Sequence, residues 1–396
     1  MLPEYLNINK RYYYTKLNNS EKRLYEFMVD CLMNNHMKFI YKYEFDDIDL
    51  NSDDLPVFTA SILESIIITK VWTYMLLDFP EFYFVHEFEF YHEGNVIYMG
   101  SKKPYYEVCE INEINKKLED ILFNFESLTD EYEIVYAVND FICKNYEYDS
   151  VTKDYNLNNN NYDNSIWRRH REKFTIAGLI KYGIGVCSAL SGLAQFILQR
   201  KGIKVINVDG QKSNEEFGHK WLLVNLDNEY YNLDVTFNNT LSNDPSLPKY
   251  MFLNNDYDLS KHIYLPQSDE ECELLKNSNG IKYNYYYKND LLFNDINKLK
   301  YKLKENILYN LTNKQTNINS RYYYYFRITN DFVNSLDNDK SNIESDMKKY
   351  DIEFKSYFNN FILEFLKKLN KEYDINISYC RLIEKYNHFT LIYVIN

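Results

Sequence analysis

The feature of this sequence that most constrains its fold is the segment 183–237, in which a glycine turn, one helix pattern and three strand patterns follow in close succession. Gly183 and Gly185 form a turn directly before Cys187. After the cysteine, apolar residues recur at helical spacing on one side, at Leu190, Leu193, Ala194 and Ile197. Gly202 then ends the pattern, as glycine commonly does after a helix. The pattern predicts that Cys187 lies at the N-terminus of a helix.

Three strand patterns follow this helix, over 204–208, 218–226 and 230–237. His219 lies in the second strand and Asp234 in the third, and residues 227–229 turn the chain between them. Because side chains alternate between the two faces of a strand, an even-numbered loop places His219 and Asp234 on the same face. A three-residue loop or an odd bulge would turn Asp234 to the opposite face.

The three residues together suit nucleophilic catalysis. A thiol at a helix N-terminus faces backbone N–H groups and the positive end of the helix dipole, which both lower its pKa. The same N–H groups can hold a developing oxyanion. We expect His219 to take the proton of Cys187 and later protonate a leaving amine, and Asp234 to fix the imidazole tautomer. A cysteine in an apolar helix without such partners is usually a core residue, which is how we interpret Cys31 and Cys143.

Three short motifs carry a resemblance to a known family: Gly185-Val186-Cys187, His219-Lys220-Trp221 and Leu233-Asp234-Val235-Thr236-Phe237. They resemble the bacterial type of the transglutaminase-like superfamily, whose papain-like core uses a cysteine, a histidine and an aspartate. The resemblance extends more weakly over about residues 55–265. It implies that Cys187, His219 and Asp234 are catalytic, and Ser188, Trp167 and Trp221 are candidates for oxyanion or substrate contacts. Lys220 departs from the family, which usually has a small residue there.

The rest of the chain predicts an α+β protein with three parts. Residues 1–110 read as a helical region with a β-hairpin, 111–266 as a papain/transglutaminase-like catalytic core, and 280–396 as a small C-terminal α+β domain of unknown role. A helix is expected from Ser20, which we predict to be its N-cap. Residues 150–172 form a long polar loop that leads into the Cys187 segment.

Composition excludes several classes of function. The net charge of −13 argues against nucleic-acid binding. The six cysteines form no C-x-x-C pair, His86 and His92 lack zincin spacing, and no EF-hand pattern occurs, so we expect no metal or other cofactor. The most apolar stretch, 62–77, is too short and too charged for membrane insertion. The start has no signal peptide pattern, which favours a cytoplasmic protein, or a secreted or surface protein if a leader has been removed.

Three functions are compatible with these features, and they share a protein or peptide partner. A Cys187 thioester formed from a peptide or glutamine side-chain amide is resolved by water in a protease or deamidase. The same thioester is resolved by a lysine amine in a cross-linking transglutaminase. The alternative is a non-catalytic binding or scaffold protein that retains the fold.

Overall fold

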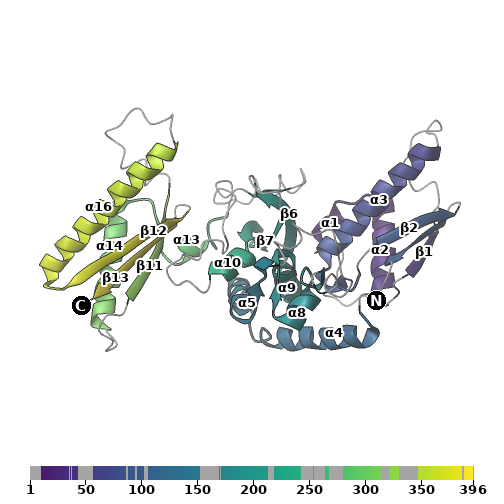
Figure 1. Ribbon diagram of the computed structural model, residues 1–396, viewed down its shortest axis with the longest axis horizontal. Coiled ribbons are helices and arrows are strands. Elements are labelled where there is room, and N and C mark those ends of the chain that lie inside the picture. The colour runs from purple at the N-terminus through teal and green to yellow at the C-terminus, as the bar shows by residue number, and fades with distance from the viewer. Residues whose placement is uncertain are drawn as a thin grey trace. The chain divides into compact units, whose positions relative to one another are not determined.

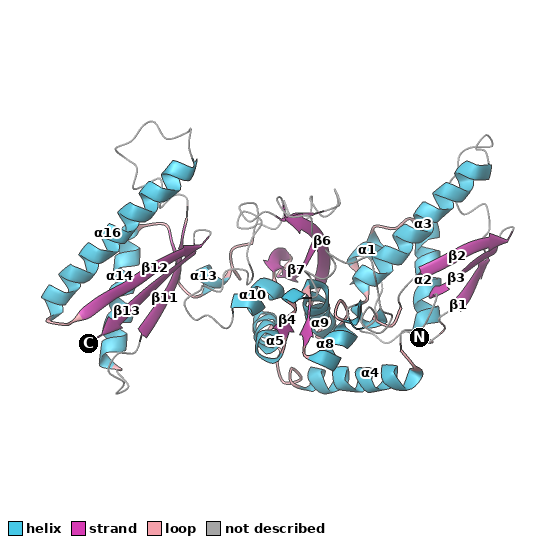
Figure 2. Ribbon diagram, in the orientation of Figure 1, coloured by secondary structure: helices cyan, strands magenta, loops and turns pink. Residues whose placement is uncertain are grey.

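The computed structural model divides the chain into two compact units, residues 1–240 with 263–279, and residues 241–262 with 280–396. The structure describes residues 10–34, 36, 38–42, 57–85, 88–93, 96–101, 106–151, 169, 171–212, 218–241, 253, 264–266, 280–313, 321–329, 347–385 and 388–395. Helices and strands are mixed in both units, which confirms the predicted α+β class (Figure 2). The three-part division at residues 110 and 266 stays a prediction.

The first unit begins with helices and a small antiparallel sheet. The helices are α1 (Tyr12–Thr15), α2 (Asn19–Met33), α3 (Val57–Asp78) and the 3-10 turn η4 (Pro80–Phe82). The sheet has the order β1-β3-β2, with β1 at Lys38–Lys42, β2 at Phe88–Glu93 and β3 at Val96–Ser101. The predicted hairpin is therefore present, and β1 joins it as a third strand. Asn18 and not Ser20 caps α2, because its side chain accepts the N–H of Glu21 while the Glu21 carboxylate accepts the N–H of Asn18.

A buried helix packed against an antiparallel sheet forms the core of this unit (Figure 1). The helix is α9 (Cys187–Arg200), which packs against β6 (Val205–Lys212) and β7 (Gly218–Leu226). The sheet has the order β8-β7-β6-β9, with β8 at Glu229–Leu233 and β9 at Tyr264–Pro266. The remaining elements are α4 (Val108–Phe123), α5 (Glu131–Asn145), β4 (Glu147–Tyr148), α8 (Ile176–Tyr182), β5 (Ile184–Gly185) and α10 (Val235–Leu241). Helices α5 and α8 contact α9, so α9 is enclosed by both helices and sheet.

The turn between β7 and β8 sets the register of the sheet. Asp227 and Asn228 both adopt left-handed backbone angles, with φ of 51° and 65°, as a two-residue hairpin turn requires. Leu226 pairs with Glu229 and Leu222 with Leu233, so odd-numbered residues of β7 share a face with even-numbered residues of β8. The predicted continuation of this strand to 237 is wrong, since α10 begins directly after Asp234.

Asp78, at the end of α3, ties the N-terminal segment to the core. Its carboxylate accepts hydrogen bonds from the N–H groups of Tyr13 and Tyr14 and from the hydroxyl of Tyr25. Its backbone carbonyl accepts the side-chain amide of Gln199 in α9. Burial raises the pKa of Asp78 to about 6, although these hydrogen bonds oppose the rise. Asp78 thus joins α1 and α2 to the end of α3 through its carboxylate, and α9 through its backbone carbonyl.

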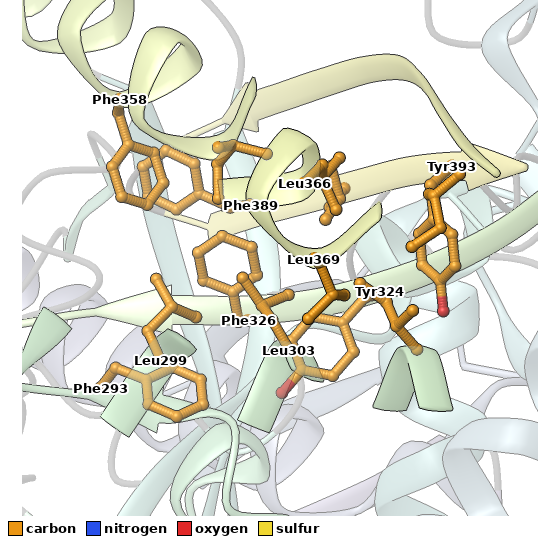
Figure 3. Packing of buried hydrophobic residues seen from close by; sticks show 14 of the residues in the cluster. Phe293, Leu299, Leu303, Tyr324, Phe326, Phe358, Leu366, Leu369, Phe389 and Tyr393 are labelled. Carbon is orange, nitrogen blue, oxygen red and sulfur yellow. The ribbon is translucent and has the colours of Figure 1, made fainter. Parts of the chain in front are cut away.

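Among the described residues of the second unit, the two longer helices pack against a four-stranded sheet and share one hydrophobic core with it. Its elements are α13 (Tyr285–Lys288), β10 (Leu292–Phe293), α14 (Ile296–Thr312), β11 (Arg321–Ile328), α16 (Met347–Tyr373), β12 (Ile377–Lys385) and β13 (His388–Ile395). The strand order is β10-β11-β13-β12. Figure 3 shows the core, in which Phe326 of β11 and Phe389 of β13 stack under Phe358 of α16. Across the described parts of both units, no helix has the length and apolarity needed to span a membrane.

Candidate active site

Cys187 is the first residue of α9, as the sequence predicts. Val186 is the N-cap, and its carbonyl accepts the N–H groups of Ala189 and Leu190. The N–H groups at the very start of a helix precede the first intrahelical hydrogen bond and point toward whatever lies beyond its end. The far end of α9 is closed by Gly202, which has a φ of 79°. The helix therefore presents both the thiol and its first N–H groups at one place.

His219 and Asp234 lie on one face of the sheet and are hydrogen-bonded to each other. Nε2 of His219 lies 2.6 Å from Oδ2 of Asp234. The other carboxylate oxygen accepts the N–H of Phe237 at 3.0 Å, so Asp234 also caps α10. The Asp234 side chain is only 2% exposed. Both oxygens are therefore held, and the carboxylate is fixed against the imidazole.

The third contact links the helix to the sheet. The Cys187 thiol and the His219 imidazole are hydrogen-bonded, and the backbone N–H of Lys220 also donates to the sulfur. Because Nε2 of His219 is bonded to Asp234, Nδ1 is the ring nitrogen left for the sulfur. The three predicted side chains are thus brought together in the order cysteine, histidine, aspartate.

The electrostatics of this group favour a thiolate and an imidazolium. Burial by itself raises the pKa of Cys187, but the hydrogen bond and charge of His219 and the N–H of Lys220 outweigh burial, so the pKa lies below its ordinary value of 9.0. Burial by itself lowers the pKa of His219, but the charge and hydrogen bond of Asp234, helped by Cys187, raise it to about 10. The imidazole of His219 is therefore held in its protonated form at neutral pH, and the Cys187 thiol ionises more readily than an ordinary cysteine.

Aromatic neighbours hold the imidazole in place. The ring of Trp221 lies parallel to that of His219, with centroids 6.1 Å apart, and Phe237 meets His219 edge-on at 5.9 Å. Trp221 is buried and donates its indole N–H to Oδ1 of Asn232 at 2.9 Å. Since that N–H is engaged, Trp221 does not serve as an oxyanion donor. It lies where it restricts rotation of the histidine.

The other two predicted contact residues have different outcomes. Ser188 follows Cys187 in α9, and its hydroxyl donates to the carbonyl of Phe174 at 2.8 Å. The side chain of Ser188 therefore braces the start of the helix. Trp167, like most of the long polar loop, lies outside the described residues.

Lys220, the departure from the family pattern, points away from the histidine face. Its ammonium lies 3.4 Å from Oδ2 of Asp209, the residue that pairs with it across β6 and β7. Its side chain therefore does not enter the cysteine–histidine contact, although its backbone N–H does. Within the described residues, no group of three or more histidine, cysteine, aspartate or glutamate side chains could hold a metal ion.

Sequence reasoning missed two contributors to the site. The Lys220 N–H could not be predicted, because every residue except proline has a backbone N–H group. Asn232, which accepts the indole N–H of Trp221, could have been predicted. It precedes Asp234 by two residues, so strand alternation places both side chains on the same face.

A cysteine at a helix N-terminus, bonded to a histidine on an antiparallel sheet that is bonded in turn to an aspartate, defines a papain-like arrangement. Residues 111–241 match the family model described as the transglutaminase-like domain, so this segment of the chain is a transglutaminase-like domain. The match is narrower than the resemblance over residues 55–265.

Among solved structures, the chain is similar to a crystal structure of a TGase, at 12% identity and a TM-score of 0.28, over 50% of this chain and 50% of that one. It is also similar to a candidate cysteine protease from Cytophaga hutchinsonii, at 15% identity and a TM-score of 0.23, over 38% of this chain and 61% of that one. No curated protein matches the chain.

Proposed function

We propose that the protein is a cysteine-dependent acyl-transfer enzyme that acts on peptide or glutamine side-chain amides through a thioester on Cys187. The observation that carries the proposal is the contact of the Cys187 thiol with the His219 imidazole, which is backed by Asp234 at 2.6 Å from Nε2. The transglutaminase-like domain over residues 111–241 supports the same chemistry. A protein or peptide is the expected partner.

In the first half of the reaction, the thiolate of Cys187 attacks the amide carbonyl carbon. A C–S bond forms and the carbonyl electrons move onto oxygen, where the N–H groups at the start of α9 can stabilise the negative charge. The oxyanion then collapses, the C–N bond breaks, and the His219 imidazolium gives its proton to the departing amine. The products of this half are a thioester on Cys187, a neutral imidazole and a free amine or ammonia.

In the second half, the neutral His219 accepts a proton from an incoming water or amine as its oxygen or nitrogen attacks the thioester. The C–S bond breaks and the sulfur leaves as thiolate, which restores the original ion pair. Water yields a carboxylic acid, and a lysine amine yields a new amide. Asp234 holds Nε2 of His219 through both halves, so that Nδ1 stays directed at the reacting atoms.

A glutamine-containing peptide blocked at both ends tests the proposal. Release of ammonia in buffer indicates deamidation, formation of a hydroxamate on addition of hydroxylamine indicates amine transfer, and cleavage of unfolded casein indicates proteolysis. We expect at least one of these activities, and we expect Cys187→Ala to abolish it.

The matched control for this assay is Cys109→Ala, because Cys109 is an exposed cysteine outside the site. Absence of all three activities, together with ordinary reactivity of the Cys187 thiol, would contradict the proposal. That result would favour the non-catalytic binding or scaffold protein.

A further inference from the structure

Two short segments hold the backbone that leads into Cys187. From one side, the N–H groups of Glu147 and Asp149 donate to the carbonyls of Gly183 and Gly185, at 3.0 and 2.9 Å. This is the parallel pairing of β4 with β5.

The second segment, residues 173–174, holds the same backbone from its other side. The carbonyl of Lys173 accepts the N–H of Val186 at 3.1 Å, and the carbonyl of Phe174 accepts the Ser188 hydroxyl at 2.8 Å. The residues immediately before and after Cys187 are therefore both bonded to this segment.

A buried ion pair joins the two holding segments to each other. The ammonium of Lys173 contacts Oδ2 of Asp149, and the two side chains are 10% and 4% exposed. A buried charge that loses its counter-ion is strongly unfavourable, so each of these groups requires the other in place. The ion pair thereby links the two segments that hold β5, the strand directly before Cys187.

We propose that Lys173 and Asp149 are positioning residues that set the sulfur of Cys187 against its partners on β7. This inference rests on the proposed function, and it adds two residues that hold the nucleophile Cys187 in position. The groups that stabilise the thiolate, the His219 imidazole and the Lys220 N–H, both belong to β7. Cys187 belongs to a different element, so its alignment with them depends on the backbone that enters α9.

Close packing leaves this backbone little freedom of its own. A Cβ placed on Gly185 would lie 3.2 Å from the carbonyl oxygen of Lys173 and 2.9 Å from Cβ of Ala189. A displacement of the Lys173 backbone would therefore also displace Gly185 and, through the chain, Cys187. A displacement of about 1 Å in a reacting group is enough to slow a reaction by about 10²-fold.

The test is the pH dependence of iodoacetamide alkylation in the full chain, with Lys173→Met as the variant. Methionine keeps much of the apolar stem and removes the charge. At about pH 6 we expect the alkylation rate of Cys187 to fall by about tenfold or more, because thiolate is lost with the alignment. Cys109, measured in the same sample, should be unchanged. Exchanging the charges, Asp149→Lys with Lys173→Asp, should recover part of the rate.

Two controls separate positioning from general loss of stability. Val29→Ala truncates a fully buried side chain of α2, and we expect it to destabilise the protein without moving the Cys187 profile. If Lys173→Met fails to fold, Asp149→Asn provides a milder weakening of the same ion pair. An unchanged profile in the variant that folds, or an equal change in Val29→Ala, would overturn the proposal.

Turnover of the glutamine peptide, measured on the same proteins, distinguishes this proposal from the proposed function. Rapid alkylation of Cys187 without any turnover would count against the enzyme, while the positioning role would still be judged by the Lys173→Met profile. Turnover by the wild type with an unchanged profile in Lys173→Met would overturn the positioning role alone.

Discussion

Replacing Asp234 with asparagine removes one negative charge from the site and keeps the size of the side chain. Asparagine can still accept the N–H of Phe237, and it is as good an N-cap as aspartate, so α10 should be retained. With its oxygen on Phe237, the asparagine presents its NH2 group, a donor, to Nε2 of His219. The substitution therefore removes both the negative charge and the acceptor for the imidazolium proton.

The size of the carboxylate's contribution follows from the pKa of His219. Its rise from 6.5 to about 10 corresponds to about 5 kcal/mol in favour of the imidazolium, at about 1.4 kcal/mol per pKa unit. The Asp234 charge is the largest contribution that raises the pKa, whereas burial lowers it. Without the carboxylate, burial is opposed only by Cys187, so we expect the imidazole to lose its proton at a lower pH. The Cys187 thiol should then ionise less readily, because an imidazolium no longer faces it.

The assay is the rate of Cys187 alkylation by iodoacetamide across the pH range, with Cys109 as the internal reference. In the wild type we expect reactivity well below the ordinary thiol pKa of 9.0. In Asp234→Asn we expect the alkylation rate of Cys187 to rise only at the higher pH at which an ordinary thiol ionises. At pH 6 the rate should be about tenfold or more below that of the wild type. Turnover should fall by about 10²- to 10⁴-fold. A wild-type alkylation profile in Asp234→Asn would refute this reasoning.

Three further predictions concern stability. In the wild type, the contribution of His219 to the unfolding free energy is full below pH 6.5 and declines as pH rises, while that of Cys187 is lost at low pH and grows toward pH 9.0, so the two slopes oppose each other. In Cys187→Ala only the decline should remain, so urea unfolding should show stability falling above pH 6.5. Asp78→Asn should change the pH dependence of the unfolding free energy between about pH 4 and 6. Because the pKa of Asp78 is raised, the native state binds this proton more tightly than the unfolded state, and the wild type loses about 3 kcal/mol of unfolding free energy as pH rises through that window. Equal slopes in both proteins would contradict this. Gly178→Ala should lower the unfolding free energy by about 3 kcal/mol, because the alanine Cβ would lie 2.0 Å from the carbonyl oxygen of Glu172. Thermal or urea unfolding measures this, and a wild-type melting curve would contradict the prediction.

The sequence predicts those parts of the site that depend on the spacing of apolar residues in a helix or on the alternation of side chains in a strand. Helical spacing after Cys187 placed the thiol at the start of α9, and strand alternation placed His219 and Asp234 on one face. That second inference depended on the loop, and the left-handed angles of Asp227 and Asn228 supply the two-residue turn that it needs.

The parts that the sequence did not predict depend on contacts between distant segments or on competing local bonds. The third strand ends at Leu233 because Asp234 caps a helix, and the capping bond is not visible in the apolar pattern. The ion pair of Lys173 and Asp149 joins residues on either side of a long polar loop, and no repeat or spacing relates them. Strand β1 likewise joins the hairpin from a separate segment.

The most direct test of the central claim is to acylate the protein with p-nitrophenyl acetate and locate the acetyl group by mass spectrometry after acid quench. We predict a single thioester on Cys187 at neutral pH, absent in Cys187→Ala and strongly reduced in His219→Ala. Acetylation of Cys187 no greater than that of the exposed Cys109 would contradict the account.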